Sequence, residues 1–171
     1  MNRAFDVQLC AWNDAAQALR DVRHAVFVVE QGVPEALEFD AADLASIHAL
    51  AQDAAGTPIG CARLLADGHI GRVAVLAQWR GHGVGRALMQ MLIARAAARG
   101  DAAVIVNAQV QAMPFYARDG FVATGDAFLE AGIAHRVMTR ALRVRDGRAT
   151  LRFERYSAPP RKLRTRAKAR A

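Results

Sequence analysis

The stretch WRGHGVGRAL, residues 79–88, sets three glycines at alternate positions between two arginines and then continues as an apolar helical pattern. Glycine lets main-chain N–H groups face a ligand without a Cβ in the way, and a helix N-terminus adds partial positive charge. The stretch therefore predicts an anion-binding turn that leads from a strand into a helix. A tight turn without any ligand is the alternative that the glycines alone leave open.

Two familiar phosphate-binding motifs are excluded at this turn. A dinucleotide fingerprint, G-x-G-x-x-G, needs a third glycine where Arg86 stands in this chain. A P-loop needs Gly-Lys-Ser/Thr, and the first lysine of the chain is Lys162. The pattern that fits is R-x-x-G-x-G, formed by Arg80, Gly83 and Gly85.

The composition is that of one globular domain. The chain has 171 residues, of which 53% are hydrophobic and 23% charged. No apolar run approaches the ~20 residues of a membrane helix, and Asp6 comes too early for a signal peptide. Cys10 and Cys61 are far apart and have no metal-like spacing, so we expect reduced packing residues. These features predict a cytoplasmic protein without a metal site or a membrane partner.

The positive charge is concentrated at the C-terminal end. Residues 142–171 contain 11 Lys/Arg and two acidic residues, whereas the first 141 residues contain 12 and 14. Residues 157–171 carry six positive charges, no acid and little to bury, so we expect a disordered basic tail. Such a tail keeps one alternative open, namely a protein that contacts RNA or the ribosome through it.

Hydrophobic periodicity predicts an α/β fold. The expected strands are residues 5–9, 47–53, 59–67, 68–77, 102–108, 121–125 and 133–142. The expected helices run from an N-cap at Asn13 or Asp14 to Gly32, over 84–99 up to Gly100, and over 111–119 before Gly120. Residues 35–46 are expected to form a loop, and 143–156 an extra C-terminal hairpin around Asp146-Gly147. This order, β-α-β-β-β-α-β-α-β-β, predicts a mixed sheet with helices on its faces, and ligands of such sheets bind beyond the strand ends.

With these motifs in this order, the chain resembles the GNAT superfamily of acyl-CoA-dependent N-acetyltransferases. The signature R/Q-x-x-G-x-G/A is matched by Arg80, Gly83 and Gly85, and a second signature by VNAQVQAMPFYARDGF, residues 106–121. Residues 26–50, 71–89 and 128–138 further resemble the ElaA/YjcF-like branch. The resemblance covers residues 5–142, departs from the usual pattern at Ala77, and implies a mostly antiparallel sheet of six to seven strands.

The resemblance also implies a reaction and a set of ligand contacts. An acetyl group would pass from acetyl-CoA to a primary amine of an unidentified small molecule or peptide, by direct attack in a ternary complex without a metal. The main chain of residues 73–75 would follow the pantetheine arm, and the N–H groups of residues 81–86 would hold the pyrophosphate. The expected cofactor-binding residues are Val73, Ala74, Val75, Arg80, Gly81, His82, Gly83, Val84, Gly85, Arg86, Asn107 and Tyr116.

Tyr116 is the expected general acid, because a phenol can protonate the departing thiolate; the alternative is an aromatic ring used for packing. Asn107 would hydrogen-bond the pantetheine or cap the next helix. Glu130 and His135 are the expected candidates for a general base, with a chain of water molecules as the alternative. The remaining ionisable groups expected near the acceptor are Glu30, Asp40, Asp43 and His48.

Two further questions stay open at this stage. Arg63 and Arg72 lie on adjacent expected strands, where they would favour a carboxylate- or phosphate-bearing acceptor if they point inward; otherwise they are surface residues of a sheet. A module that binds acyl-CoA without catalysis is the second alternative to the enzyme.

Overall fold

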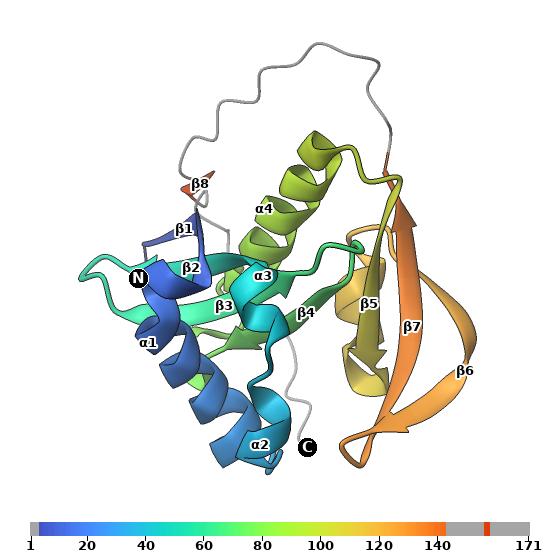
Figure 1. The fold of residues 1–171 in the computed structure, drawn as a ribbon, viewed down its shortest axis with the longest axis horizontal. Helices are drawn as coiled ribbons and strands as arrows, with labels where there is room; N and C mark the ends of the chain where they lie inside the picture. Colours follow the sequence, from blue (N-terminus) through green and yellow to red (C-terminus); the bar gives the residue numbers. More distant parts are fainter. Residues whose placement is uncertain (1–3, 143–155, 158–171) are drawn as a thin grey trace.

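The computed structural model describes residues 4–142 and 156–157, which form two antiparallel sheets with helices packed on them (Figure 1). The first sheet has the strand order β4-β3-β2-β1-β8 and consists of β1 (Phe5–Cys10), β2 (Ile47–Asp53), β3 (Pro58–Leu64), β4 (Ile70–Val75) and β8 (Tyr156–Ser157). The second has the order β5-β7-β6 and consists of β5 (Ala103–Gln109), β6 (Val122–Glu130) and β7 (Ile133–Ala141).

Two long helical segments flank the first sheet. The first is α1 (Trp12–Arg23), which continues as the π-helix η1 (His24–Glu30), and the second is α4 (Val84–Arg99). The short helices are α2 (Glu35–Glu38), α3 (Ala42–Ala45), η2 (Ala77–Trp79), η3 (Val110–Ala112) and α5 (Met113–Ala117). This order of elements confirms the α/β fold and its β-α-β-β-β-α-β-α-β-β sequence.

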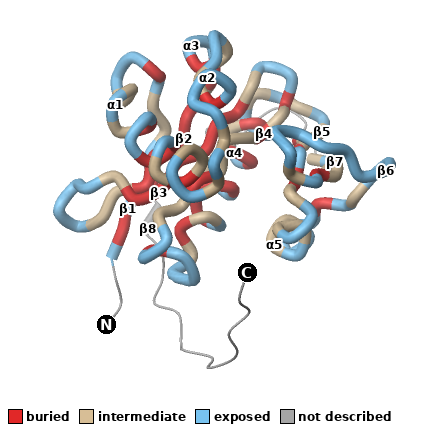
Figure 2. Tube along the Cα trace, turned by 90° about the horizontal axis from the view of Figure 1, so that it is seen from below, coloured by how far each residue is buried: buried red, intermediate tan, exposed pale blue. Residues whose placement is uncertain are grey.

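The two helical segments cover opposite faces of the sheet, as the alternation along β2 shows. Ala49 and Ala51 belong to the core beneath α4, together with Leu88 and Leu92, whereas Leu50 belongs to the core beneath α1. Successive strand residues point to opposite faces, so β2 contributes to both cores. In Figure 2 the buried segments accordingly run through the middle of the molecule, between its exposed outer turns.

Three local expectations are corrected by the structure. The N-cap of α1 is Ala11 rather than Asn13 or Asp14. The first turn, which begins at the buried Trp12, is separated from the rest of α1 by a kink at Ala15, whose φ is −140°. The stretch 35–46, expected to be a loop, contains the one-turn helices α2 and α3. The expected single sheet is divided into two.

The expected hairpin 143–156 and the expected tail 157–171 lie outside the described residues, except for Tyr156–Ser157. These two residues pair with β1.

The two sheets meet at the start of neighbouring strands and then separate. His69 forms a parallel bridge with Ile105, and Ile105 N–H donates to Gly68 O at 3.1 Å. From there β4 and β5 run in different directions (Figure 1). We call the divergence between residues 72–75 of β4 and residues 107–109 of β5 the splay. It leaves one main-chain edge of β4 without a strand partner in the described part of the chain.

None of the described helices has the length and apolar composition that a membrane crossing needs. Cys10 and Cys61 are free thiols. Burial raises the pKa of Cys61 to about 12 and that of Cys10 to about 11, so both are protonated and unreactive at neutral pH. Cys61 packs in the core beneath α1, as expected for a packing residue.

Candidate functional site

The glycine turn connects β4, through η2, to the N-terminus of α4. Gly81 has a φ of 78° and Gly83 a φ of 90°, a left-handed conformation that strains any other residue. The first hydrogen bond of the helix runs from Ala87 N–H to Gly83 O at 3.0 Å. The N–H groups of residues 83–86 therefore precede the helical hydrogen bonds, and they lie at the positive end of the helix dipole. This is an arrangement that binds phosphate.

Arg80 is fixed at this turn by two neighbours. Its Nε donates to Val75 O at 3.0 Å, and its Nη1 and Nη2 donate to the two carboxylate oxygens of Glu30 at 2.7 Å each. The side chains of Arg80 and Glu30 are both about half exposed. The hydrogen bond from Arg80 lowers the pKa of Glu30, which makes this carboxylate a poor general base.

Gly85 marks the point where α5 meets the start of α4. A Cβ on Gly85 would lie 3.4 Å from Phe115 Cζ and 3.6 Å from Val75 Cγ2. The glycine turn, the end of β4 and the ring of Phe115 are therefore in contact. The chain position after Phe115 is Tyr116, so the fold brings the second sequence motif next to the first.

The end of β4 presents one main-chain carbonyl toward the splay. Leu76 N–H donates to Ile59 O of β3 at 2.9 Å, and directions alternate along a strand, so the carbonyl of Val75 faces the other side, where Arg80 binds it. Ala74 pairs with Cys61 and directs its main-chain groups toward β3. Three residues are expected along the pantetheine arm. Of these, Val75 directs its main-chain groups toward the splay, and Val73 lies beside a bulge at Arg72, whose φ is 52°.

Tyr116 combines a packed ring with an uncommitted hydroxyl. The ring stands edge-on to Phe115 at 5.0 Å and to Phe121 at 5.9 Å between centroids. Within the described residues, the hydroxyl has no hydrogen-bond partner. Burial raises the pKa of Tyr116 to about 12, so the phenol keeps its proton at neutral pH. The ring of Tyr116 therefore packs against its aromatic neighbours, as the packing alternative predicts. The hydroxyl still carries a proton that it can donate.

The second sheet carries the other predicted site residues. Asn107 Nδ2 donates to Glu130 Oε2 at 3.4 Å, and both side chains are exposed. The N-caps of η3 and α5 are Gln109 and Ala112, so Asn107 does not cap the next helix. His135 is 9% exposed, with Nδ1 2.8 Å from Ile133 O, and its ring stacks on Phe128 at 6.0 Å. The contacts of His135 are those of a packed residue.

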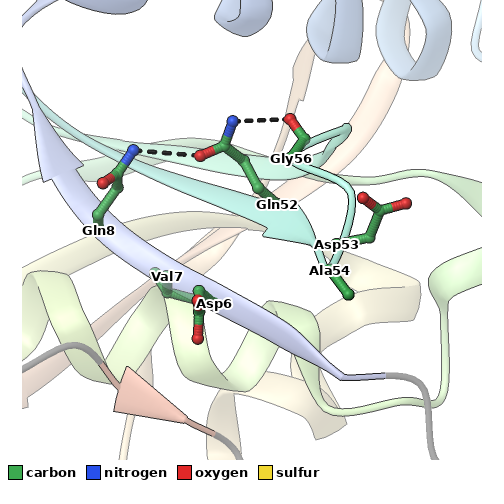
Figure 3. Close-up of a pocket in the computed structure, with 7 residues that line it drawn as sticks. All are labelled: Asp6, Val7, Gln8, Gln52, Asp53, Ala54 and Gly56. Atoms are coloured by element: carbon green, nitrogen blue, oxygen red, sulfur yellow. Dashed lines mark hydrogen bonds between the residues drawn. The ribbon is translucent and has the colours of Figure 1, made fainter.

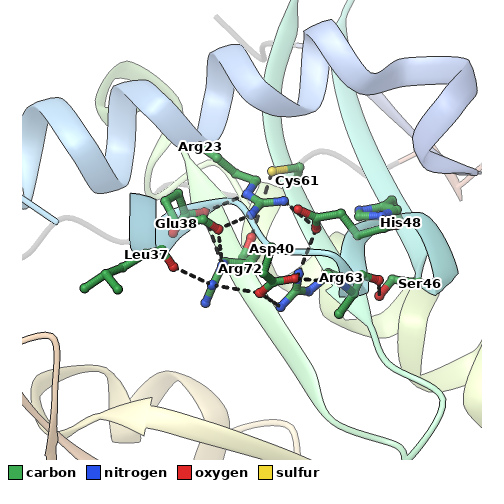
Figure 4. Close-up of polar contacts among 11 residues, drawn as sticks. Arg23, Leu37, Glu38, Asp40, Ser46, His48, Cys61, Arg63 and Arg72 are labelled. Carbon is green, nitrogen blue, oxygen red and sulfur yellow. Dashed lines mark hydrogen bonds and ion pairs between the residues drawn. The ribbon is translucent and has the colours of Figure 1, made fainter. Parts of the chain in front are cut away.

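Three arginines and three carboxylates form a network on the α1 side of the first sheet (Figure 4). The members are Arg23, Arg63, Arg72, Glu38, Asp40 and Asp43. Arg23, which is 1% exposed, donates to Glu38 Oε1 at 2.6 Å and to Asp43 Oδ1 at 2.7 Å. Arg63 donates to Asp43 Oδ1 at 2.8 Å and to Asp40 Oδ1 at 2.7 Å. The network connects α1, the segment 35–46 and two strands.

This network bears on the open question of Arg63 and Arg72. Arg63 is buried among carboxylates of the chain itself, and Arg72 donates to Glu38 O at 3.1 Å and to Asp40 Oδ2 at 3.3 Å. Because carboxylates already balance these charges, the two arginines give no support to an anionic acceptor. Their contacts instead hold α2 and the following residues against the sheet.

The network argues against Asp40 and Asp43 as general bases, and burial argues against His48 beside it. Burial alone would raise the pKa of Asp43, but hydrogen bonds from Arg23 and Arg63 outweigh it and hold that pKa below its ordinary value. Burial lowers the pKa of His48, whose Nε2 lies 2.9 Å from Asp43 O. Asp40 also has a lowered pKa, because hydrogen bonds from Arg63 outweigh its burial.

A pocket of about 220 Å³ lies elsewhere, at the β1–β2 side of the first sheet (Figure 3). It is lined by Asp6, Val7, Gln8, Gln52, Asp53, Ala54 and Gly56. Its lining includes no residue of the glycine turn or of the splay, so we do not assign this pocket to the site.

The site geometry, a glycine turn at a helix N-terminus beside a splayed strand, agrees with the comparison to known families. A family model described as an acetyltransferase (GNAT) domain matches residues 15–142. The chain belongs to the GNAT acetyltransferases. It is 40% identical over 123 residues to the uncharacterized N-acetyltransferase YjcF of Bacillus subtilis, a match that covers 70% of this chain and 87% of YjcF.

Two solved GNAT structures are similar over nearly their whole length. An acyl-CoA N-acyltransferase from Pseudomonas aeruginosa has 34% sequence identity and a TM-score of 0.72, and Escherichia coli ElaA has 30% identity and a TM-score of 0.71. Each alignment covers 80% of this chain and 99% of the other. The chain is thus a GNAT acyltransferase of the ElaA/YjcF-like branch, with a CoA-linked donor.

Sequence reasoning missed three residues of the candidate site and of the arginine–carboxylate network. Glu38 is buried at 3% exposure and accepts from Arg23, although the stretch around it looks like a polar loop. Phe115 touches the glycine turn, and Gln31 accepts a hydrogen bond from Gln109 at 3.0 Å. Phe115 could have been noticed from its place beside Tyr116. The other two depend on partners far away in the sequence.

Proposed function

We propose that the protein transfers an acetyl group from acetyl-CoA to a primary amine of a small molecule or peptide, by direct attack within a ternary complex. The observation that carries this proposal is the row of N–H groups of residues 83–86, which precede the hydrogen bonds of α4 at the end of a splayed strand. Four such donors at a helix N-terminus suit the two phosphates of a pyrophosphate.

Acetyl-CoA would lie with its pyrophosphate at the glycine turn and its pantetheine arm in the splay. The N–H groups of residues 81–86 would hold the pyrophosphate, and the two N–H groups of Arg80 that neither Val75 nor Glu30 occupies would add charge. The edge of β4 at Val73 and Val75 would hydrogen-bond the pantetheine amides, and Asn107 of β5 would do so from the other side. These contacts would hold the thioester near Tyr116.

The reaction needs one bond formed and one broken. The neutral amine nitrogen attacks the thioester carbonyl, the C–N bond forms, and the C–S bond breaks. The thiolate sulfur takes the proton of the Tyr116 hydroxyl, and the amine releases its extra proton to water or to Glu130. We favour water or Glu130 over His135, because His135 is buried and stacked on Phe128. Burial raises the pKa of Tyr116 to about 12, which keeps the phenol protonated at neutral pH but makes it a weaker acid than a thiol, so the transfer depends on direct contact between the thiolate sulfur and the hydroxyl. The phenolate left behind regains its proton from water.

The test is a panel of primary amines and peptides incubated with acetyl-CoA, with release of free CoA thiol as the readout. Amine-dependent thiol release, and a mass increase of one acetyl group on the amine, would support the proposal. Measurable CoA binding without thiol release from any amine would instead favour a module that binds acyl-CoA without catalysis. Absence of CoA binding would contradict both.

A further inference from the structure

The last two residues before Gly32 contact both strands that border the splay. Glu30 binds Arg80 through two hydrogen bonds of 2.7 Å, and Arg80 in turn binds Val75 O at 3.0 Å. Gln31 accepts from Gln109 Nε2 at 3.0 Å in a partly buried contact. Val75 is the last residue of β4, and Gln109 is the last residue of β5. Two neighbouring residues therefore connect the ends of both diverging strands.

In the described chain no main-chain pairing joins those two ends, although side chains of both strands pack into one core with α4. The parallel bridge between His69 and Ile105 lies at the start of β4, and β4 pairs with β3 on its other side. Main-chain hydrogen bonds set strand spacing only where strands pair. The segment that supplies Glu30 is a π-helix, a rare conformation that is frequent at functional sites.

The contact of Glu30 leaves Arg80 able to bind a ligand. A guanidinium has five N–H donors. Three of them bind Val75 O and the two oxygens of Glu30, so two remain for a phosphate. Glu30 accordingly orients Arg80 at the turn while one N–H on each of Nη1 and Nη2 remains for a ligand.

From these contacts we propose that Glu30 and Gln31 are positioning residues that set the spacing of the splay for acyl-CoA. Glu30 orients Arg80, which in turn faces the phosphates of acyl-CoA and holds the carbonyl of Val75. Gln31 acts through Gln109 on the end of β5, beside the pantetheine arm. This inference rests on the proposed function, since it assumes that acyl-CoA enters the splay. A spacing fixed before binding improves affinity because less freedom is lost when the ligand binds.

The first experiment compares CoA with its fragment adenosine 3′,5′-bisphosphate, by calorimetry on the full chain. The variants are Gln31→Leu, Gln109→Leu and the double variant, with melting temperatures to establish the folded fraction. We expect each single variant to weaken CoA binding roughly 2- to 10-fold, the effect of one lost hydrogen bond. The double variant should lose no more than the larger single effect. The fragment lacks pantetheine, so its affinity should not change.

The second experiment uses Glu30→Gln, which removes the charge and keeps the size. Because Glu30 acts through Arg80 at the phosphates, affinity for CoA and for the fragment should fall together by roughly 2- to 10-fold. Glu30→Asp should recover part of the loss, since it restores the charge.

Three results would overturn the inference. Tighter CoA binding by Glu30→Gln would mean that Glu30 competes with the phosphates for Arg80. Additive losses in the Gln31 and Gln109 variants would show that the two residues act separately. An equal loss for the fragment in the Gln31 variant would indicate general damage to the fold. A wild-type protein that binds no CoA would contradict the proposed function instead, so the two failures are distinguishable.

Discussion

The glycine turn and the arginine–carboxylate network are both rich in arginine, and the fold uses the arginines in different ways. At the turn, Arg80 is about half exposed and keeps two N–H groups without partners among the residues that the structure describes. In the network, Arg23 is 1% exposed and directs its guanidinium to Glu38 and Asp43. The comparison shows that an arginine near a site binds a ligand only if the fold leaves its donors open.

The same contrast holds for the other polar groups of the glycine turn and of the arginine–carboxylate network. At the turn, the N–H groups of residues 83–86 and the hydroxyl of Tyr116 lack partners in the described chain. In the network, each of the six charged side chains hydrogen-bonds another member or the main chain, although Arg63 Nε and Asp43 Oδ2 are buried without a hydrogen-bond partner in the described residues. Charged groups that pair within the chain hold the fold together, whereas exposed donors without a partner remain available to a ligand.

The largest expected effect is on turnover, in Tyr116→Phe. The substitution keeps the ring between Phe115 and Phe121 but removes the proton that the thiolate would take. We expect turnover to fall by roughly 10²- to 10⁴-fold, with CoA affinity and melting temperature little changed. Thiol release and melting temperature should be measured on one preparation. Normal turnover on the true acceptor would show that solvent or another group protonates the thiolate.

The next effect is on stability and uses the same substitution in both regions. Arg23→Met removes the buried guanidinium that pairs with Glu38 and Asp43, which keep only Arg72 and Arg63 respectively, so the free energy of unfolding should fall by up to about 3–5 kcal/mol. Arg80→Met breaks a half-exposed ion pair and should cost less than about 1 kcal/mol. Denaturant unfolding of both variants checks the contrast. Equal losses would mean that the two regions do not differ as the structure indicates.

A smaller effect is on ligand affinity, in Gly83→Val. A Cβ there meets no atom within 4 Å, so it would project into open space and strain the backbone at a φ of 90°. Loss of one or more N–H contacts to a phosphate should weaken acetyl-CoA binding roughly 10- to 100-fold. Gly56→Val is the matched control, because Gly56 has a φ of 82° and equally open surroundings. If both variants bind acetyl-CoA alike, the turn does not hold the pyrophosphate.

The smallest effect is a pH dependence from His48. Burial lowers the pKa of this histidine below 6.5, so the unfolded chain takes up a proton at a higher pH than the folded protein does. The resulting stability is present above pH 6.5 and is lost progressively as the pH falls toward the folded pKa. Replacing His48 with Phe, which keeps a ring beside Trp12, should flatten the dependence of melting temperature on pH below 6.5. An unchanged slope of melting temperature against pH would mean that other titrating groups cause the pH dependence.

The sequence alone determined the order of elements and the position of the glycine turn. Both follow from short-range properties: apolar periodicity selects helix or strand, and positive φ at Gly81 and Gly83 requires residues without a Cβ. The position of Tyr116 after β5 also followed from local pattern and from resemblance. These features depend on neighbours in the chain, so they can be inferred without coordinates.

Only the tertiary structure decided which polar groups are paired. Arg80 meets Glu30 across 50 positions, and Gln109 meets Gln31 across 78. Arg63, which the sequence allowed as a ligand for an anionic acceptor, is instead neutralised by Asp40 and Asp43. Charge and residue type are visible in the sequence, but partners and burial depend on the packing of distant segments. The strength of an ionic contact depends on its partners and on its burial, because desolvation changes the energy of the contact more than the identity of the residues does.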